Sequence, residues 1–291
     1  MKLINSRKLP GNTLSLIARS LKKQWKRYRN ELQRCQKDFS EKSVHKSRIT
    51  ARRLLSTLEL LSPFLPAQRI KKARQRLKRH LDSFDDLRDT QIQMAAVTEL
   101  LRAFPKARGF DLWLREREER FAGRTRYRLK RISTKPLAKL VSACQKDLKK
   151  QRQECPPKVA ATRLERSVGG AFARTLTLRK RIDRRQTNSI HCTRVAFKRF
   201  RYMVEVLAAH LPAADEKLLA EMQHYQTMMG DIQDTEVLLR ALDKYLRKKK
   251  SDFPRGFREE LVRRSQWLIR VYLDAADQLH EFWPLPWVTR A

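Results

Sequence analysis

A short basic pattern occurs twice in this chain, separated by about half of its length. His-x-x-Arg-x-x-x-(Arg/Lys)-Arg runs from His45 to Arg53 and again from His191 to Arg199, so the copies lie 146 residues apart in a chain of 291 residues. A second element repeats at nearly the same distance, because Asp86–Thr90 matches Asp231–Thr235 at a separation of 145 residues. A repeat of this kind indicates two copies of one folding unit.

Helical periodicity dominates both copies. Apolar residues recur at spacings of three and four, as in the segment from Leu14 to Phe39, and the chain has only 7 glycines and 11 prolines. In the first half this pattern predicts helices over about 14–39, 44–61, 67–103 and 110–132, and in the second half helices over about 159–182 and 188–209, followed by two long helices that break near Leu211-Pro212 and Phe253-Pro254.

Four long helices with short connections in each half predict an all-α fold. We expect two tandem, pseudo-symmetric, antiparallel four-helix bundles. The first bundle would cover residues 1–135, a connecting helix residues 136–157, and the second bundle residues 158–291, which end in a proline-broken tail from Trp283 to Trp287.

The charge of the chain limits its partners. Its 67 Lys and Arg residues against 31 Asp and Glu residues give a formal net charge of +36, although 41% of the residues are hydrophobic. A folded protein of this charge seeks anionic partners such as nucleic acid, an anionic membrane or an inorganic polyanion. The scattered cysteines and the lack of a long apolar run predict a soluble protein of the reducing cytoplasm, without a signal peptide or membrane span.

The repeated pattern places one histidine and two cations on one stripe of a helix. Positions i, i+3 and i+7 share a face, so the stripes are His45, Arg48 and Arg52, and His191, Arg194 and Lys198. Both histidines follow potential helix-capping residues, Ser40 or Ser43 in the first half and Thr187 or Asn188 in the second half. Unpaired N–H groups at a helix start attract phosphate. The structural alternative is that each histidine caps its helix or packs on a neighbour and that the arginines form a solvated face. The duplication of the pattern favours phosphate binding.

Other cations extend this candidate phosphate-binding set. The adjacent residues of the two motifs are Arg53 and Arg199. Weaker candidates lie on the first three helices and beyond the second motif, namely Arg19, Lys22, Lys23, Lys26, Arg27, Lys46, Lys71, Arg74, Lys78, Arg201 and Tyr202.

One acidic motif suggests an enzyme. Asp85-Asp86-Leu87-Arg88-Asp89 matches D-D-x-x-D, which holds magnesium diphosphate in all-helical isoprenoid synthases. The second half keeps only Asp231 and Asp234, so we favour the interpretation that these carboxylates pair with arginines of a neighbouring helix and orient them. Glu221-x-x-His224 lacks the partner motif of a di-iron site. We therefore predict no catalytic residue, no metal site and no cofactor.

Nucleic-acid binding remains the alternative function. Proteins that bind single strands combine cations with exposed aromatic platforms. Here Trp25, Tyr28 and Phe84 fall on apolar faces, and Tyr202 is the main exception. We expect only weak, non-specific nucleic-acid binding at low salt.

Taken together, these motifs resemble the CHAD family, the conserved histidine α-helical domain. The matching residues are His45-x-x-Arg48 with Arg52-Arg53, His191-x-x-Arg194 with Lys198-Arg199, and the aspartate elements at 86–89 and 231–234. The resemblance implies two four-helix bundles around a basic cavity, contacts from both motifs to inorganic polyphosphate, and association with polyphosphate granules. Gln233 stands where Arg88 does, and the helix after Asp215 lacks the stripe of Lys71, Arg74 and Lys78. These departures predict stronger binding by the first half.

Overall fold

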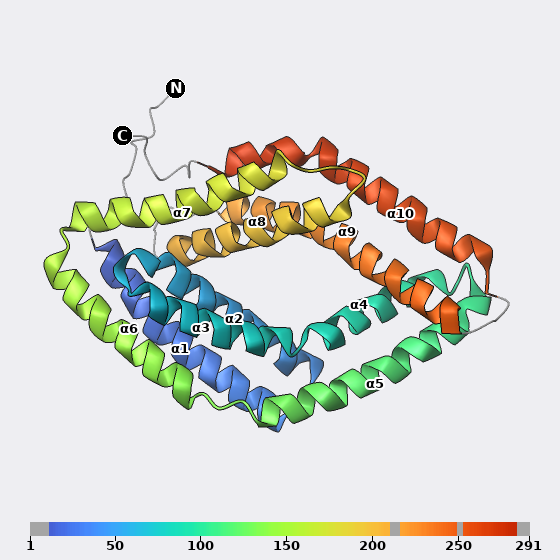
Figure 1. The fold of residues 1–291 in the computed structure, drawn as a ribbon, viewed down its shortest axis with the longest axis horizontal. Helices are drawn as coiled ribbons and strands as arrows, with labels where there is room; N and C mark the ends of the chain where they lie inside the picture. Colours follow the sequence, from blue (N-terminus) through green and yellow to red (C-terminus); the bar gives the residue numbers. More distant parts are fainter. Residues whose placement is uncertain (1–11, 210–215, 249–252, 284–291) are drawn as a thin grey trace.

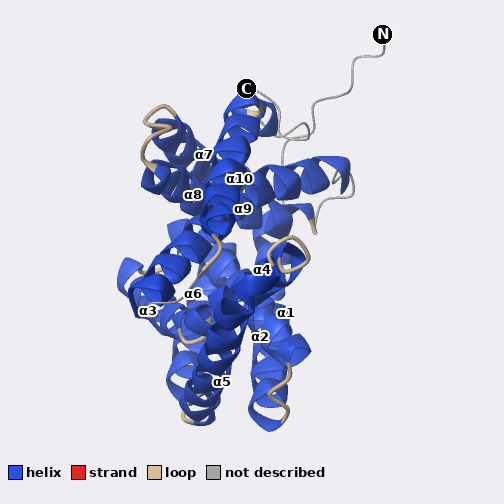
Figure 2. Ribbon diagram, turned by 90° about the vertical axis from the view of Figure 1, so that its right-hand side faces the viewer, coloured by secondary structure: helices blue, strands red, loops and turns tan. Residues whose placement is uncertain are grey.

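The described chain is helical throughout. The computed structural model describes residues 12–209, 216–248 and 253–283. Within these residues the structure has ten α-helices and three short 3₁₀ helices and contains no strand, and Figure 2 shows helices joined by loops only. The predicted all-α class is confirmed. None of the described helices is long and apolar enough to cross a membrane.

The first half begins with a helical hairpin. α1 (Thr13–Lys37) and α2 (Glu41–Leu60) pack along each other, and α3 (Ala67–Asp82) packs on α2. α1 buries the predicted apolar stripe, including Leu14, Ile17, Leu21, Tyr28, Leu32 and Cys35. The connecting helix α6 (Lys135–Glu154) packs against α1 and α3 and closes this side of the molecule (Figure 1).

The prediction of one continuous helix over 67–103 is wrong. The chain breaks at Ser83 and Phe84, and a separate helix α4 (Asp85–Leu100) follows. Two hydrogen bonds stabilise the break: Ser83 Oγ donates to the His80 carbonyl at 2.6 Å, and Thr125 Oγ1 donates to the Ser83 carbonyl at 3.1 Å. Phe84 is fully buried there. The break directs α4 away from α3, so that α4 pairs with α5 (Arg108–Lys130) (Figure 1).

The second half contains no corresponding break. α7 (Pro157–Arg179) pairs with α8 (Thr187–Ala208), and α8 packs on α9 (Glu216–Lys248), which continues past the position equivalent to Phe84. α10 (Arg255–Asp274) returns along α9. The predicted break at Leu211-Pro212 and the tail beyond Trp283 lie outside the described residues.

Two apolar clusters hold these helices together. The larger cluster joins α1, α2, α3 and α6 to α7, α8 and the near ends of α9 and α10. The smaller cluster joins α4 and α5 to the far ends of α9 and α10 around Phe110, Tyr245 and Phe257. Figure 1 shows the result as two helical arms, α4–α5 and α9–α10, that meet at the end remote from α6. The division into bundles at residues 1–135 and 158–291 stays a prediction.

Candidate functional site: a basic cavity between the two halves

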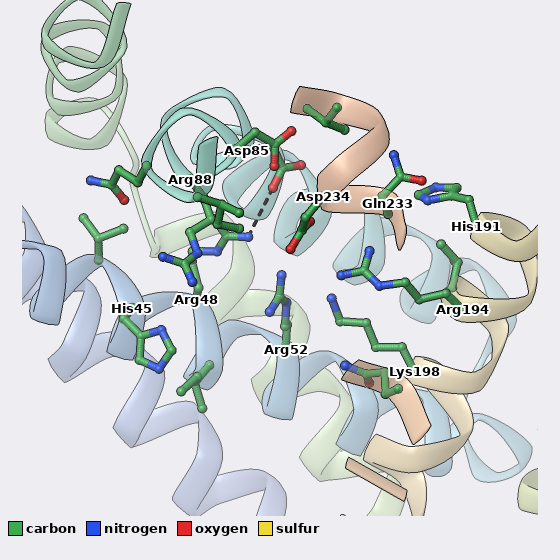
Figure 3. A pocket seen from close by; sticks show the side chains of 18 of the residues that line it. His45, Arg48, Arg52, Asp85, Arg88, His191, Arg194, Lys198, Gln233 and Asp234 are labelled. Carbon is green, nitrogen blue, oxygen red and sulfur yellow. Dashed lines mark hydrogen bonds and ion pairs between the residues drawn. The ribbon is translucent and has the colours of Figure 1, made fainter. Parts of the chain in front are cut away.

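The two helices that carry the repeated motif pack against each other and face one cavity. α2 and α8 are in contact, and α4 is in contact with α9. Between these four helices lies a cavity of about 470 Å³. Its polar lining residues are Glu41, His45, Arg48, Arg52, Asp85, Arg88, Asp89, Gln91, His191, Arg194, Lys198, Gln226, Gln233 and Asp234 (Figure 3). The structure thus brings all six residues of the two predicted stripes to one place.

Both histidines occupy the same position in their helices, although only α2 is capped by a side chain. Ser40 caps α2 and forms a capping box, in which Ser43 N–H donates to Ser40 Oγ and Ser40 N–H donates to Ser43 Oγ. α8 begins at Thr187 after Gln186, which makes no side-chain cap. His45 and His191 are therefore each the fifth residue of their helix, near the end where the helix dipole is positive.

Arg48 is held firmly by the chain break after α3. Its side chain is almost completely buried, and its guanidinium donates to the Phe84 carbonyl and to Asp85, each at 3.4 Å. Burial and the charge of Arg52 lower the pKa of Arg48 to about 10. The break at Ser83 and Phe84 thus provides an acceptor for Arg48, and Asp85 pairs with an arginine as interpreted from the sequence.

Arg194, the counterpart of Arg48, has no such ion-pair partner in the described part of the chain. Gly230 stands at the position equivalent to Asp85, and a Cβ atom there would lie 3.6 Å from Nε and Nη2 of Arg194. The buried Nε of Arg194 makes no hydrogen bond within the described residues. The guanidinium of Arg194 is therefore more available to a ligand than that of Arg48. This favours an order of contributions opposite to the one expected from the sequence, where the first half was predicted to bind more strongly.

The low pKa of Lys198 reflects its burial and the excess of positive charge in the cavity. Burial, followed by the charges of Arg52, Arg194 and Arg48, lowers the pKa of Lys198 to about 6. The pKa of His191 is also lowered, by burial first and by Arg194 second. Figure 3 shows Lys198, Arg52 and Arg194 converging on the same space, with Gln233 beside His191. An anion in this space would stabilise the protonated forms of Lys198 and His191.

Carboxylates line the opposite wall, on α4 and α9. Desolvation, Asp85 and Asp234 raise the pKa of Asp89 to about 6. Desolvation also raises the pKa of Asp234, against the nearby positive charge of Arg194. Within the described residues, no group of three or more His, Cys, Asp or Glu side chains is placed to hold a metal ion.

The remaining predicted cations lie elsewhere. Glu59, which is 4% exposed, forms ion pairs with Arg199 at 3.0 Å and Arg74 at 3.5 Å, so both arginines hold α2, α3 and α8 together. Arg201 is buried and bonds to Gln226 at 2.9 Å. Its guanidinium stacks on the Tyr202 ring, and neither residue lines the cavity. Arg53, one of the main candidates, is exposed and does not line the cavity either. The same is true of the weaker candidates Arg19, Lys22, Lys23, Lys26, Arg27, Lys46, Lys71 and Lys78.

Sequence reasoning left one cation of the cavity out of the candidate set. Arg88 lines the cavity from α4 and forms an ion pair with Glu41 at 3.7 Å. Its position inside the repeated Asp-Leu-Arg-Asp element could have identified it. Gln226 also lines the cavity, but no pattern in the sequence marks it.

Comparison with known proteins agrees with this architecture. The family model of the CHAD domain matches residues 18–243. A crystal structure of the CHAD domain from the plant Ricinus communis superposes with a TM-score of 0.62 at 15% identity, covering 97% of this chain and 92% of that chain. Comparison with curated proteins gave no match. Because the family model covers well over half of the chain, the chain belongs to the CHAD family.

Proposed function

We propose that this protein binds inorganic polyphosphate in the cavity between α2, α4, α8 and α9, without turning it over. The observation that carries the proposal is the convergence of the two histidine–cation stripes on one cavity, where burial and then the neighbouring arginines lower the pKa of Lys198 to about 6. Association with cytoplasmic polyphosphate granules is part of the same proposal.

Polyphosphate suits this lining better than nucleic acid does. Arginine forks bond two oxygens of one phosphate, and a chain with one charge per phosphate engages several cations in succession. Nucleic-acid sites for single strands add aromatic platforms for the bases. No Phe, Tyr or Trp is among the described residues that line the cavity, and its only aromatic rings are the imidazoles of His45 and His191. The lining therefore supports recognition of phosphate groups that carry no base.

The carboxylates favour a positioning role over catalysis. Asp85 forms an ion pair with Arg48, which fixes the guanidinium at the cavity wall. Asp86, the second carboxylate of the D-D-x-x-D motif, does not line the cavity. We propose that Asp85, Asp89 and Asp234 orient the arginines of α2 and α8 while a polymer is bound.

A charge-matched pair of variants tests the proposal. Arg52→Gln/Arg194→Gln/Lys198→Gln removes three cations that line the cavity. Lys146→Gln/Lys149→Gln/Arg152→Gln removes three exposed cations from α6. Because each charge-assisted hydrogen bond contributes about 1.5–3 kcal/mol, the cavity variant should bind polyphosphate at least about 100-fold more weakly. The α6 variant should stay close to the unsubstituted protein. Equal losses would show that diffuse charge, not the cavity, binds the polymer.

A further inference from the structure

A second, separate cavity lies where α3 and α5 end and α6 begins. Its volume is about 400 Å³, and Tyr28 and His80 form part of its wall. Four exposed arginines frame it, Arg76, Arg79, Arg128 and Arg131. No acidic residue belongs to its lining. We call it the His80 cavity.

His80 is the unusual member of this lining. Its side chain is 3% exposed, and its ring packs between Tyr28 and Phe84, with ring centroids 5.4 Å and 5.2 Å away. His80 Nδ1 lies 3.0 Å from the hydroxyl oxygen of Tyr28. Burial raises the pKa of Tyr28 far above its usual range, so the hydroxyl keeps its proton and can donate it to Nδ1.

Two tautomers of His80 are compatible with this contact, because the Tyr28 hydroxyl can donate to Nδ1 or accept from it. Burial, followed by the charge of Arg48, lowers the pKa of His80 to about 4, so the ring is neutral at physiological pH. In the tautomer in which Nδ1 accepts from Tyr28, the single ring proton is on Nε2. Nε2 is buried and has no hydrogen-bond partner within the described residues. A buried N–H without an acceptor is costly, so this group calls for an acceptor.

Helix dipoles explain only part of this cluster. Arg79 and Arg128 lie in the last turns of α3 and α5, where cations are favourable. The carbonyls at the end of α5 are already bonded, because Gln36 Nε2 donates to Leu129 at 2.8 Å and to Ile132 at 3.1 Å. A neutral imidazole contributes nothing to the dipole interaction. The unpaired Nε2 of His80 therefore needs a separate explanation.

We propose that the His80 cavity is a second anion site, which binds a compact phosphate-class anion of the size of inorganic diphosphate. His80 Nε2–H would donate to a phosphate oxygen at the wall, and the four arginines would hold the remaining oxygens at the mouth. Since the ring is neutral, His80 acts as a hydrogen-bond donor and the arginines supply the charge. The site is distinct from the central cavity, with which it shares no lining residue.

The experiment isolates this site in the full chain. In the Arg52→Gln/Arg194→Gln/Lys198→Gln background, which removes central-cavity cations but keeps Arg48 beside Phe84, titration calorimetry with inorganic diphosphate should show one saturable site. Adding Arg79→Gln/Arg131→Gln should weaken that site at least tenfold. The control Arg102→Gln/Arg108→Gln removes two exposed arginines outside both cavities and should leave the affinity within about twofold.

Nitrogen NMR on histidine-labelled protein supplies the second readout. The Nε2–H signal of His80, assigned with His80→Gln, should shift on diphosphate addition with the midpoint measured by calorimetry. The proposal is overturned if no saturable site remains in the background variant, if the two arginine pairs lose affinity equally, or if the His80 signal does not move.

Discussion

The low pKa of Lys198 predicts that polyphosphate binding takes up a proton. In the free protein this pKa is about 6, against an ordinary lysine value near 10.4. A bound phosphate stabilises the ammonium form and raises the pKa in the complex. At pH 7 the free side chain is mostly neutral, so binding should transfer close to one proton, about 0.9, to Lys198.

The sign and the size of the effect on affinity follow. Below pH 6 Lys198 is already charged, so affinity does not depend on its titration. Above pH 6 each pH unit costs about 1.36 kcal/mol, or tenfold in affinity, until the pKa in the complex is reached. Between pH 6 and pH 8 the Lys198 contribution therefore weakens binding by up to about 100-fold. Ionisation of Asp89, whose pKa is about 6, acts in the same direction because it adds negative charge to the cavity.

A substitution that fixes the charge separates these contributions. Lys198→Arg keeps a cation at every accessible pH. Calorimetry with polyphosphate of one chain length, at constant ionic strength and in two buffers of different ionisation enthalpy, gives both affinity and proton uptake. Lys198→Arg should lose most of the uptake at pH 7 and flatten the decline in affinity, and Asp89→Asn should remove the smaller remainder. If Lys198→Arg and the unsubstituted protein show the same uptake and the same decline, Lys198 does not titrate on binding and the reasoning is wrong.

Three further predictions concern stability. Lys198→Met should raise the melting temperature at pH 5, where the buried ammonium is charged in the folded state, and the gain should shrink toward pH 8 as Lys198 loses its proton. Arg48→Gln should lower the free energy of unfolding by about 1–3 kcal/mol, because it leaves the Phe84 carbonyl without this donor. Arg194→Gln should leave stability nearly unchanged and weaken polyphosphate binding. Equal denaturation midpoints for the two variants would contradict this difference. Glu59→Gln should destabilise the fold by about 1–3 kcal/mol in urea unfolding and leave the polyphosphate affinity measured by calorimetry unchanged. A loss of affinity would instead place Arg199 in the binding site.

The helices themselves could be predicted because their apolar stripes are nearly uninterrupted. The break at Ser83 and Phe84 could not, since Phe84 fits the apolar stripe of a continuous helix as well as it fits the core. The interactions at the break include a tertiary hydrogen bond from Thr125, 42 residues away, which no local pattern indicates. The second half, which is continuous at the equivalent position, shows that the repeat does not encode the break.

The site was predictable to the extent that helix geometry determines it. Residues at i, i+3 and i+7 share a face, so each stripe reaches the cavity as a unit. Arg53 and Arg199 follow the stripe by one residue, a rotation of about 100°, and point elsewhere. The interaction of Glu59 with Arg199 depends on how α2 meets α8, which no local pattern encodes. Gly230 could be identified from the repeat, since it stands where the first half has Asp85, but the pairing of Asp85 with Arg48 that it cannot reproduce became visible only in the structure.

Competition at near-physiological salt tests the central claim most directly. Labelled long-chain polyphosphate bound to the full chain is challenged with single-stranded DNA, duplex DNA and RNA at matched phosphate concentration. A cavity lined by cations, with no Phe, Tyr or Trp among its described lining residues, predicts that polyphosphate stays bound against all three. Ready displacement by any of the nucleic acids would contradict the account, because the two stripes would then form a nucleic-acid surface.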